Sequence, residues 1–205
     1  MIIQRLQIVS KVEAVAQIRV LGICGSMRSR SATATAVGVA LEGAKASGAE
    51  IDFLDLVDLD LPMCDAREDD ASYPASVHAF RARVAEAQGI ILGTPEYHNS
   101  LTGALKNALD LCSRTELEHK MVGVIGVAGG SMGATNSVNH LRTIMRSVGA
   151  WVVPHQVSIG HAGRVFYGPD GLDPEYKTRL EKLGADVTKF ARLLAAGIIN
   201  ADDVA

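Results

Sequence analysis

The sequence predicts one α/β domain, a doubly wound three-layer sandwich in which helices cover both faces of a five-stranded parallel sheet. Short apolar runs alternate along the chain with longer segments of helical periodicity, the pattern of repeated β-α-β units with right-handed crossovers. Glycine is frequent, at 20 of 205 residues, and aromatic residues make up only 4%. Both values suit buried parallel strands joined by glycine-rich turns. We expect this domain at residues 18–205, after an amino-terminal leader at residues 1–17.

The elements follow from the spacing of apolar residues. Short apolar runs predict strands at residues 18–24, 51–54, 89–93, 121–127 and 150–153. The helix-periodic segments between and after them predict helices at residues 32–47, 76–87, 101–112, 135–147 and 174–195. Gly48 ends the first of these helices. The acidic stretch 55–73 lacks clean periodicity, so we expect a long loop with mainly solvated charges, and residues 154–173 are expected to be irregular.

The charge balance excludes some partners. The chain has 20 Lys and Arg against 23 Asp and Glu, a net charge of -3. It therefore lacks the positive charge with which proteins hold a nucleic-acid backbone. The longest stretch without charge, residues 121–141, is rich in Gly, Ser, Asn and Thr from residue 129 onward. Such a stretch does not form a lipid-spanning helix, so we expect no membrane association.

The cysteines and histidines indicate neither disulfides nor a metal site. Cys24, Cys64 and Cys112 form no C-x-x-C pair, and a reducing cytoplasm is the expected compartment. Cys24 and Cys112 are interpreted as small apolar core residues, and Cys64, in the acidic stretch, as the most reactive thiol. The six histidines show no H-E-x-x-H or paired Cys/His spacing, so no metal site is predicted.

The loop after the first strand has the composition of an anion site. Residues 25–31 read Gly-Ser-Met-Arg-Ser-Arg-Ser and precede a helix, where free N–H groups and the helix dipole favour an anion. The loop lacks the Walker and dinucleotide patterns, so a phosphate monoester suits it better than a pyrophosphate. The candidate ligands are Ser26, Arg28, Ser31 and Thr33. The alternative is that Ser29 or Ser31 only caps the helix and the arginines are surface charges.

The loop after the third strand carries a second motif. Residues 95–110 fit the pattern P-E-Y-x-x-S-x-x-G-x-L-K-N-x-x-D, in which Pro95 stiffens the turn and Gly103 permits a close approach. Together with G-S-x-R-x-x-S at residues 25–31, this segment resembles the NADPH-dependent FMN reductase family of flavodoxin-like proteins, which includes azo, quinone and chromate reductases. The resemblance covers roughly residues 18–195. In the family, Asn is frequent where this chain has His98, and Pro where it has Thr102.

The resemblance implies a function and a set of site residues. It implies a sheet order of 2-1-3-4-5, bound FMN, and hydride transfer from NADPH or NADH through FMN to a small-molecule acceptor such as a quinone, an azo compound, chromate, a ferric chelate or free flavin. The flavin performs the chemistry, so no catalytic side chain is expected. The flavin ring is expected along Pro95, Glu96, Tyr97, His98 and Ser100, with Gly129, Gly130 and Ser131 at its pyrimidine edge. The choice between NADPH and NADH stays open.

Similar proteins are homodimers or homotetramers, and the helix after Ser100 is expected at a subunit interface. Its polar stripe is alternatively explained by pairing of Lys106 with Asp110 and of Asp110 with Arg114. His98 is expected to bond the ring, to meet the nicotinamide or to face a neighbouring subunit.

Two other functions are alternatives. A non-enzymatic FMN electron carrier would share the fold, although such carriers usually have a strongly acidic docking face. A serine hydrolase is suggested by G-x-S-x-G at residues 129–133, with Ser131 as the nucleophile. However, no Asp or Glu lies between Ser131 and His161, the last histidine. The order of nucleophile, acid and histidine that α/β-hydrolases use is therefore absent.

Overall fold

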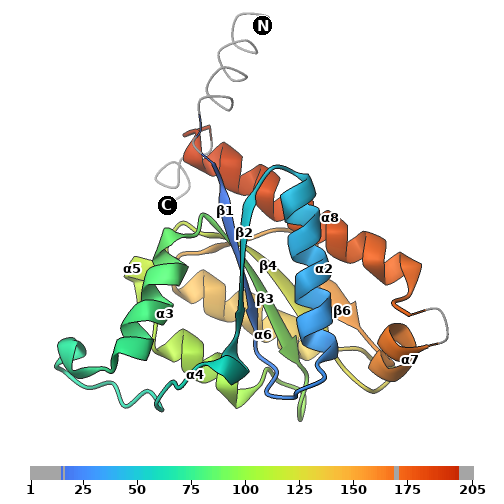
Figure 1. Ribbon diagram of the computed structural model, residues 1–205, viewed down its shortest axis with the longest axis horizontal. Coiled ribbons are helices and arrows are strands. Elements are labelled where there is room, and N and C mark those ends of the chain that lie inside the picture. The colour runs from blue at the N-terminus through green and yellow to red at the C-terminus, as the bar shows by residue number, and fades with distance from the viewer. Residues whose placement is uncertain (1–14, 16, 169–170, 199–205) are drawn as a thin grey trace, which may run out of the picture.

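A parallel sheet forms the middle layer of the molecule (Figure 1). The computed structural model describes residue 15, residues 17–168 and residues 171–198, so the predicted leader falls almost wholly outside the described residues. The main strands are β1 (Arg19–Cys24), β2 (Glu50–Asp55), β3 (Gly89–Pro95) and β4 (Met121–Val127). The strand order β2-β1-β3-β4-β5 and the parallel pairing confirm the expected topology.

The edge of the sheet beyond β4 differs from the prediction. Two short strands, β5 (Trp151–Val152) and β6 (Val157–Ile159), pair with β4 one after the other, at Met121–Val122 and at Ile125–Val127. The described sheet therefore has six strands rather than five. Pro154 explains the interruption, because proline has no N–H to continue the ladder after Val153. The stretch predicted to be irregular thus contains a strand.

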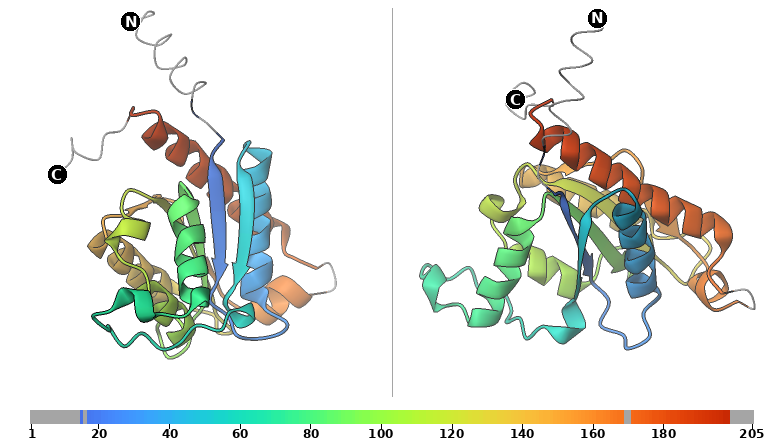
Figure 2. Two further views of the ribbon diagram at one scale, coloured as in Figure 1. Left: turned by 60° about the vertical axis from the view of Figure 1, so that its left-hand side comes forward. Right: turned by 45° about the horizontal axis from the view of Figure 1, so that its top comes forward.

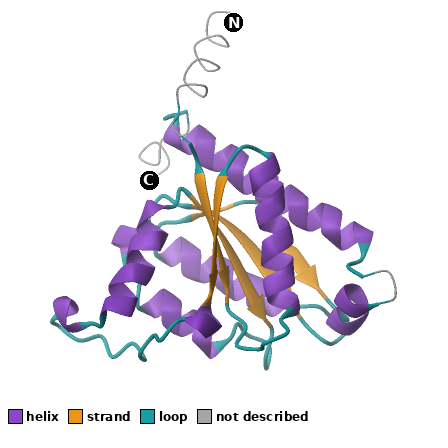
Figure 3. Ribbon diagram, in the orientation of Figure 1, coloured by secondary structure: helices purple, strands orange, loops and turns teal. Residues whose placement is uncertain are grey.

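Helices cover both faces of the sheet (Figure 3). One apolar core lies between the sheet and two helices, α2 (Ala32–Ala46) and α8 (Pro174–Ala195). The other lies under α3 (Ala75–Glu86), α4 (Gly103–Asp110) and α6 (Thr135–Ser147). Along β1, Val20 belongs to the first core, and Leu21 and Ile23 belong to the second. This alternation is the period-two pattern of a strand buried on both faces, as expected for a three-layer sandwich.

Helices α2 and α8 approach each other closely because glycines lie at their contact. A Cβ atom on Gly184 would lie 1.8 Å from the carbonyl oxygen of Ala40, and one on Gly43 would lie 2.1 Å from that of Glu181. Both distances are far inside van der Waals contact, so any side chain at these positions would separate the helices. Gly184 and Gly43 therefore set the distance between the two helices on this face.

Several boundaries differ from the sequence prediction. Helix α4 begins at Gly103 rather than at residue 101, and ends at Asp110. A separate short helix, α5 (Arg114–Leu117), follows it. Lys106 pairs with Asp110 at 2.6 Å as expected, but Arg114 pairs with Glu118 instead of with Asp110. The helix break moves Arg114 off the polar stripe.

The acidic stretch 55–73 is more structured than predicted. It contains two 3-10 turns, η1 (Leu56–Asp58) and η2 (Asp70–Ser72). Arg81 binds the carboxylate of Asp70 at 2.6 Å, and Tyr73 is buried with Arg67 over its ring. The Arg67 guanidinium binds Asp65 and lowers the pKa of that carboxyl to about 2. Part of the acidic charge is therefore paired rather than only solvated.

Candidate functional site

The three loops selected from the sequence meet at one edge of the sheet. Parallel strands β1, β3 and β4 all end there, which is where ligands bind in open α/β sheets. A cavity of about 300 Å³ lies between these loops. The predicted residues that line it are Ser26, Arg28, Ser31, Thr33, Pro95, Glu96, Tyr97 and Gly129. His98, Ser100, Gly130 and Ser131 do not line it.

One end of the cavity is rich in donors. Arg28 and Arg30 are exposed there, and neither forms an ion pair with a residue in the described part of the chain. Ser31 does cap α2, since its Oγ accepts from the N–H of Ala34 at 3.0 Å. The Ser31 hydroxyl also lies 3.9 Å from Sγ of Cys24, a long contact that its proton can leave to bind a ligand. Both interpretations of Ser31, cap and ligand, are therefore compatible.

Thr102 joins the first and second loops. Its Oγ1 donates to the carbonyl oxygen of Gly25 at 2.7 Å and accepts from the N–H of Leu105 at 3.2 Å, so that it caps α4. Its own N–H donates to Oγ1 of Thr94 at 3.1 Å. All three contacts are buried. A proline at this position would have neither the N–H nor the hydroxyl, so it could make none of these contacts.

Residues 97–100 form a tight hairpin, of which only Tyr97 lines the cavity. Tyr97 and Ser100 exchange backbone hydrogen bonds of 3.0 and 3.1 Å, and His98 and Asn99 between them have φ angles of 52° and 63°. Two consecutive positive φ angles define a type I′ turn, which favours Asn and Gly. Ser100 Oγ lies 3.0 Å from Nδ1 of His140 on α6, which anchors the hairpin to that helix. The His98 side chain is exposed.

Glu96 holds the second loop against the third. Its N–H donates to the carbonyl oxygen of Val127 at 2.8 Å, and its Oε2 accepts from the N–H of Ser137 at 2.9 Å. Ser137 is the third residue of α6, and the residue before that helix, Ala134, provides no side-chain cap. Glu96 therefore caps α6 from another element, a role that we did not predict from the sequence.

The third loop contributes less than predicted. Gly129 lines the cavity, but the carbonyl oxygen of Gly130 accepts from the N–H of His161 at 3.0 Å. Ser131 is exposed and lines a second cavity. The histidine side chains with hydrogen bonds in the described residues are His140 and His155, and their partners are Ser100 and Arg179. No described histidine activates Ser131, which gives the hydrolase hypothesis no structural support.

Helix α7 (Ala162–Tyr167), drawn in orange in Figure 2, was not predicted from the sequence. Its residues Ala162, Gly163 and Tyr167 line the cavity. The Tyr167 hydroxyl donates to the carbonyl oxygen of Arg30 at 3.4 Å, which connects this helix with the first loop. Just before α7, the apolar-polar-apolar alternation of Val157-Ser158-Ile159 indicates a strand, which we did not predict. The lining residues absent from the prediction are Arg30, Ala32, Val127, Ala128, Ala162, Gly163 and Tyr167.

The cysteines lie outside the cavity. Burial raises the pKa of Cys24 to about 11 and that of Cys112 to about 12. Both thiols stay protonated at neutral pH, which fits core residues. Cys64 donates from Sγ to the carbonyl oxygen of Asp110 at 3.3 Å. Within the described ranges there is no cluster of three or more potential metal ligands, and no helix there is both long and apolar enough to cross a membrane.

The sheet order defines a flavodoxin-like fold, with a cavity at the carboxyl ends of its strands. An archaeal flavodoxin shares the fold at a TM-score of 0.60 and 13% identity, over 85% of this chain and 99% of that one. An apo NADH:FMN oxidoreductase shares it at a TM-score of 0.68 and 22% identity, over 86% and 89%.

The sequence comparisons narrow this class to one family. The family model for NADPH-dependent FMN reductases matches residues 18–164. A probable NADPH:quinone oxidoreductase from Oryza sativa is 32% identical over 92% of this chain and 96% of its own length. An NADPH azoreductase from a Bacillus species is 39% identical over 53% of this chain, and the match spans 60% of that relative. The chain therefore belongs to the NADPH-dependent FMN reductase family.

Proposed function

We propose that this protein is an NAD(P)H-dependent FMN reductase that binds FMN in the cavity between the three loops and reduces a small-molecule acceptor such as a quinone or an azo compound. The observation that carries the proposal is the convergence of two elements in one cavity: the donor-rich loop at the start of α2 and the Pro95–Tyr97 turn. The first suits a phosphate monoester, and the second suits the edge of a flat ring.

The phosphate end of FMN fits the first loop by charge and by donor count. Arg28 and Arg30 supply two cations without carboxylate partners in the described chain, and Ser26 and Ser31 supply hydroxyl groups. The N–H groups of Ser29 and Arg30 have no backbone acceptor in the part of the chain that the structure describes. A phosphate monoester with two negative charges would satisfy donors that otherwise bond only to water.

The ring of FMN fits between the second and third loops. Tyr97 is 48% exposed and provides an aromatic surface at the cavity. The N–H group of Gly129, which lines the cavity, has no backbone acceptor among the described residues, so it is available at the edge of the ring. Donors at that edge would stabilise the negative charge that reduction adds to the ring. Glu96 and Thr102 hold the loops at the spacing that the ring needs.

When bound, FMN supplies the redox chemistry, taking hydride from NAD(P)H and passing electrons to the acceptor. The residues of this chain bind, orient and expose the ring, and the proposal assigns no acid, base or nucleophile to them. We also propose that the protein acts as a homodimer or homotetramer in the cytoplasm, in keeping with its free cysteines. Light scattering on the purified protein measures its mass in solution.

The test of FMN binding is titration of the apo protein with FMN, followed by fluorescence. Arg28→Ala should weaken binding by about 1.5–3 kcal/mol, roughly 10- to 150-fold, because a charge-assisted contact is lost. Arg146→Ala is the matched control, since Arg146 is exposed in the last turn of α6 and does not line the cavity. Equal affinities of the Arg28→Ala variant and the unmodified protein would overturn the phosphate assignment.

A second experiment separates the enzyme from an electron carrier. Under anaerobic conditions, NADPH should bleach the absorbance of the FMN-loaded protein within seconds to minutes if the protein is a reductase. A carrier would stay yellow with both NADPH and NADH. Ser131→Ala should leave this activity unchanged, whereas a hydrolase would lose cleavage of an activated ester.

A further inference from the structure

A second cavity, of about 350 Å³, lies next to the proposed FMN site. It is lined by the end of the third loop, the segment after β6, helix α7 and the start of α8. Its volume is within the range of roughly 300–1,000 Å³ that is typical of small-molecule sites. The lining side chains that matter here are Ser131, Thr135, His161, Arg164 and Tyr176.

The two cavities share a wall. Ala128 and Gly129 face the first cavity, and Ser131 faces the second. On helix α7, Ala162 and Gly163 face the first, and Arg164 faces the second. Hydrogen bonds of 3.0 and 3.1 Å, from His161 to Gly130 and from Ala162 to Ala128, hold the wall together. The two cavities are therefore adjacent, and one extended ligand would contact both by lying across these residues.

The second cavity combines a cation, hydroxyl groups and an apolar surface. Arg164 is exposed and forms no ion pair with any residue at 17–168 or 171–198. Ser131 and Thr135 provide hydroxyl groups, and Tyr176 provides an aromatic ring. Met132, 91% exposed, adds a polarisable side chain at the rim. A base next to a phosphorylated ribose matches this combination.

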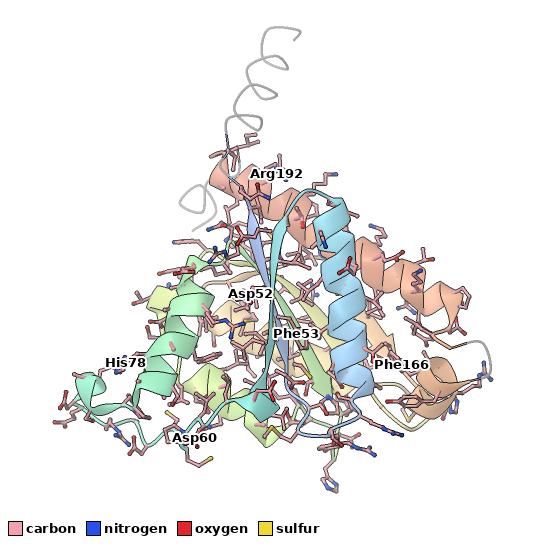
Figure 4. The ribbon with its side chains drawn as sticks, in the orientation of Figure 1. Asp52, Phe53, Asp60, His78, Phe166 and Arg192 are labelled. Atoms are coloured by element: carbon pink, nitrogen blue, oxygen red, sulfur yellow. The ribbon has the colours of Figure 1, made fainter. Side chains whose placement is uncertain are left out.

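The cavity also contains one described carboxylate, that of Asp173, and one of its two oxygens caps a helix. Asp173 Oδ1 accepts from the N–H of Glu175 at 2.9 Å and caps α8. In dinucleotide sites an acidic side chain bonds the ribose 2′-hydroxyl of NADH, whereas an arginine accommodates the 2′-phosphate of NADPH. The acidic stretch, marked by Asp60, lies on the side of the molecule opposite Phe166 of α7 (Figure 4). Asp173 keeps its negative charge while it caps α8, and Arg164 is the only arginine or lysine among the described residues that line this cavity.

We propose that the second cavity binds the adenosine 2′-phosphate end of NADPH and that Arg164 determines the preference for NADPH over NADH. The proposal rests on the proposed function, because it places the nicotinamide of the same molecule over the FMN in the first cavity. Arg164 affects how tightly the nucleotide binds and takes no part in the chemical step.

Steady-state kinetics of the FMN-loaded enzyme test this assignment, with NADPH and NADH compared at a fixed acceptor concentration. Arg164→Ala should raise the KM for NADPH roughly 10- to 150-fold, as expected for the loss of a charged hydrogen bond, and change the KM for NADH less than about twofold. Arg164→Lys should keep part of the preference for NADPH, measured as the ratio of the KM for NADH to the KM for NADPH. Arg146→Ala is the control, because it removes an exposed positive charge, in the last turn of α6, that does not line the cavity.

Binding measured without turnover gives an independent result. Adenosine 2′,5′-bisphosphate should bind the FMN-loaded protein more tightly than adenosine 5′-monophosphate by calorimetry, and Arg164→Ala should abolish the difference. Equal effects on NADPH and NADH, or a rise in the KM of the acceptor instead, would overturn the assignment. Failure of the proposed function is distinguishable, because the unmodified protein would then not bind FMN or not oxidise either nucleotide.

Discussion

Removing the carboxylate of Glu96 should destabilise the protein even when no FMN is bound. Its Oε2 accepts from the buried N–H of Ser137 at 2.9 Å, in the first turn of α6, a helix without a cap of its own. Loss of a side-chain cap costs about 0.5–2 kcal/mol. Loss of a negative charge at a helix N-terminus costs about 0.3–1 kcal/mol more. We therefore expect Glu96→Ala to lower the free energy of unfolding by about 1–3 kcal/mol.

Glu96→Gln separates the two contributions. Glutamine keeps an oxygen that can accept from Ser137 but loses the charge, so this variant should cost only about 0.3–1 kcal/mol. Glu42→Ala is the matched control, since Glu42 is exposed on α2 and makes no side-chain hydrogen bond or ion pair within the described chain. A loss of about 2 kcal/mol corresponds to a fall in Tm of about 4–8 °C for a chain of this size.

The assay is urea denaturation of the FMN-free protein, because a ligand that binds only the folded state would add its own stabilisation. The cap is refuted if apo Glu96→Ala unfolds at the same urea concentration as the unmodified protein. If the stability of this variant is unchanged but its affinity for FMN falls, Glu96 is a direct ligand of FMN, as predicted from the sequence.

Three further predictions address packing, loop geometry and thiol chemistry. Gly184→Ala should lower the free energy of unfolding by about 1–3 kcal/mol or more, because its Cβ would lie 1.8 Å from the carbonyl oxygen of Ala40. Gly38→Ala is the control: a Cβ there has no atom within 4 Å, so the variant should raise the free energy of unfolding by about 0.5–1 kcal/mol. Urea denaturation measures both changes. Thr102→Val leaves the carbonyl oxygen of Gly25 and the N–H of Leu105 without a partner, and should cost about 1–3 kcal/mol in the same assay. Because the pKa of Cys24 is raised to about 11, only about one Cys24 thiol in a thousand is ionised at pH 8. Iodoacetamide should therefore label Cys64 before Cys24, as followed by mass spectrometry, and faster labelling of Cys24 would contradict this.

The sequence was sufficient wherever local patterns determine structure. Strand β4 and helices α6 and α8 lie at the predicted residues, because a continuous apolar run and helical periodicity mark them. The edge of the sheet was harder to predict. Strand β5 lies within the strand predicted at residues 150–153, but β6 has only three residues, so its alternation is a weak signal, and its pairing with β4 depends on contacts between distant segments.

The difference between local patterns and long-range contacts also explains which site residues were predicted from the sequence. Ser26, Arg28 and Pro95 belong to motifs in which neighbours in the sequence are neighbours in space. The cap from Glu96 to Ser137 spans 41 residues, and the bond from Tyr167 to Arg30 spans 137. Nothing in the periodicity of either segment indicates such a partner. Long-range contacts of this kind determine how far the three loops stand apart, so they set the shape of the cavity, whereas the motifs supply its chemistry.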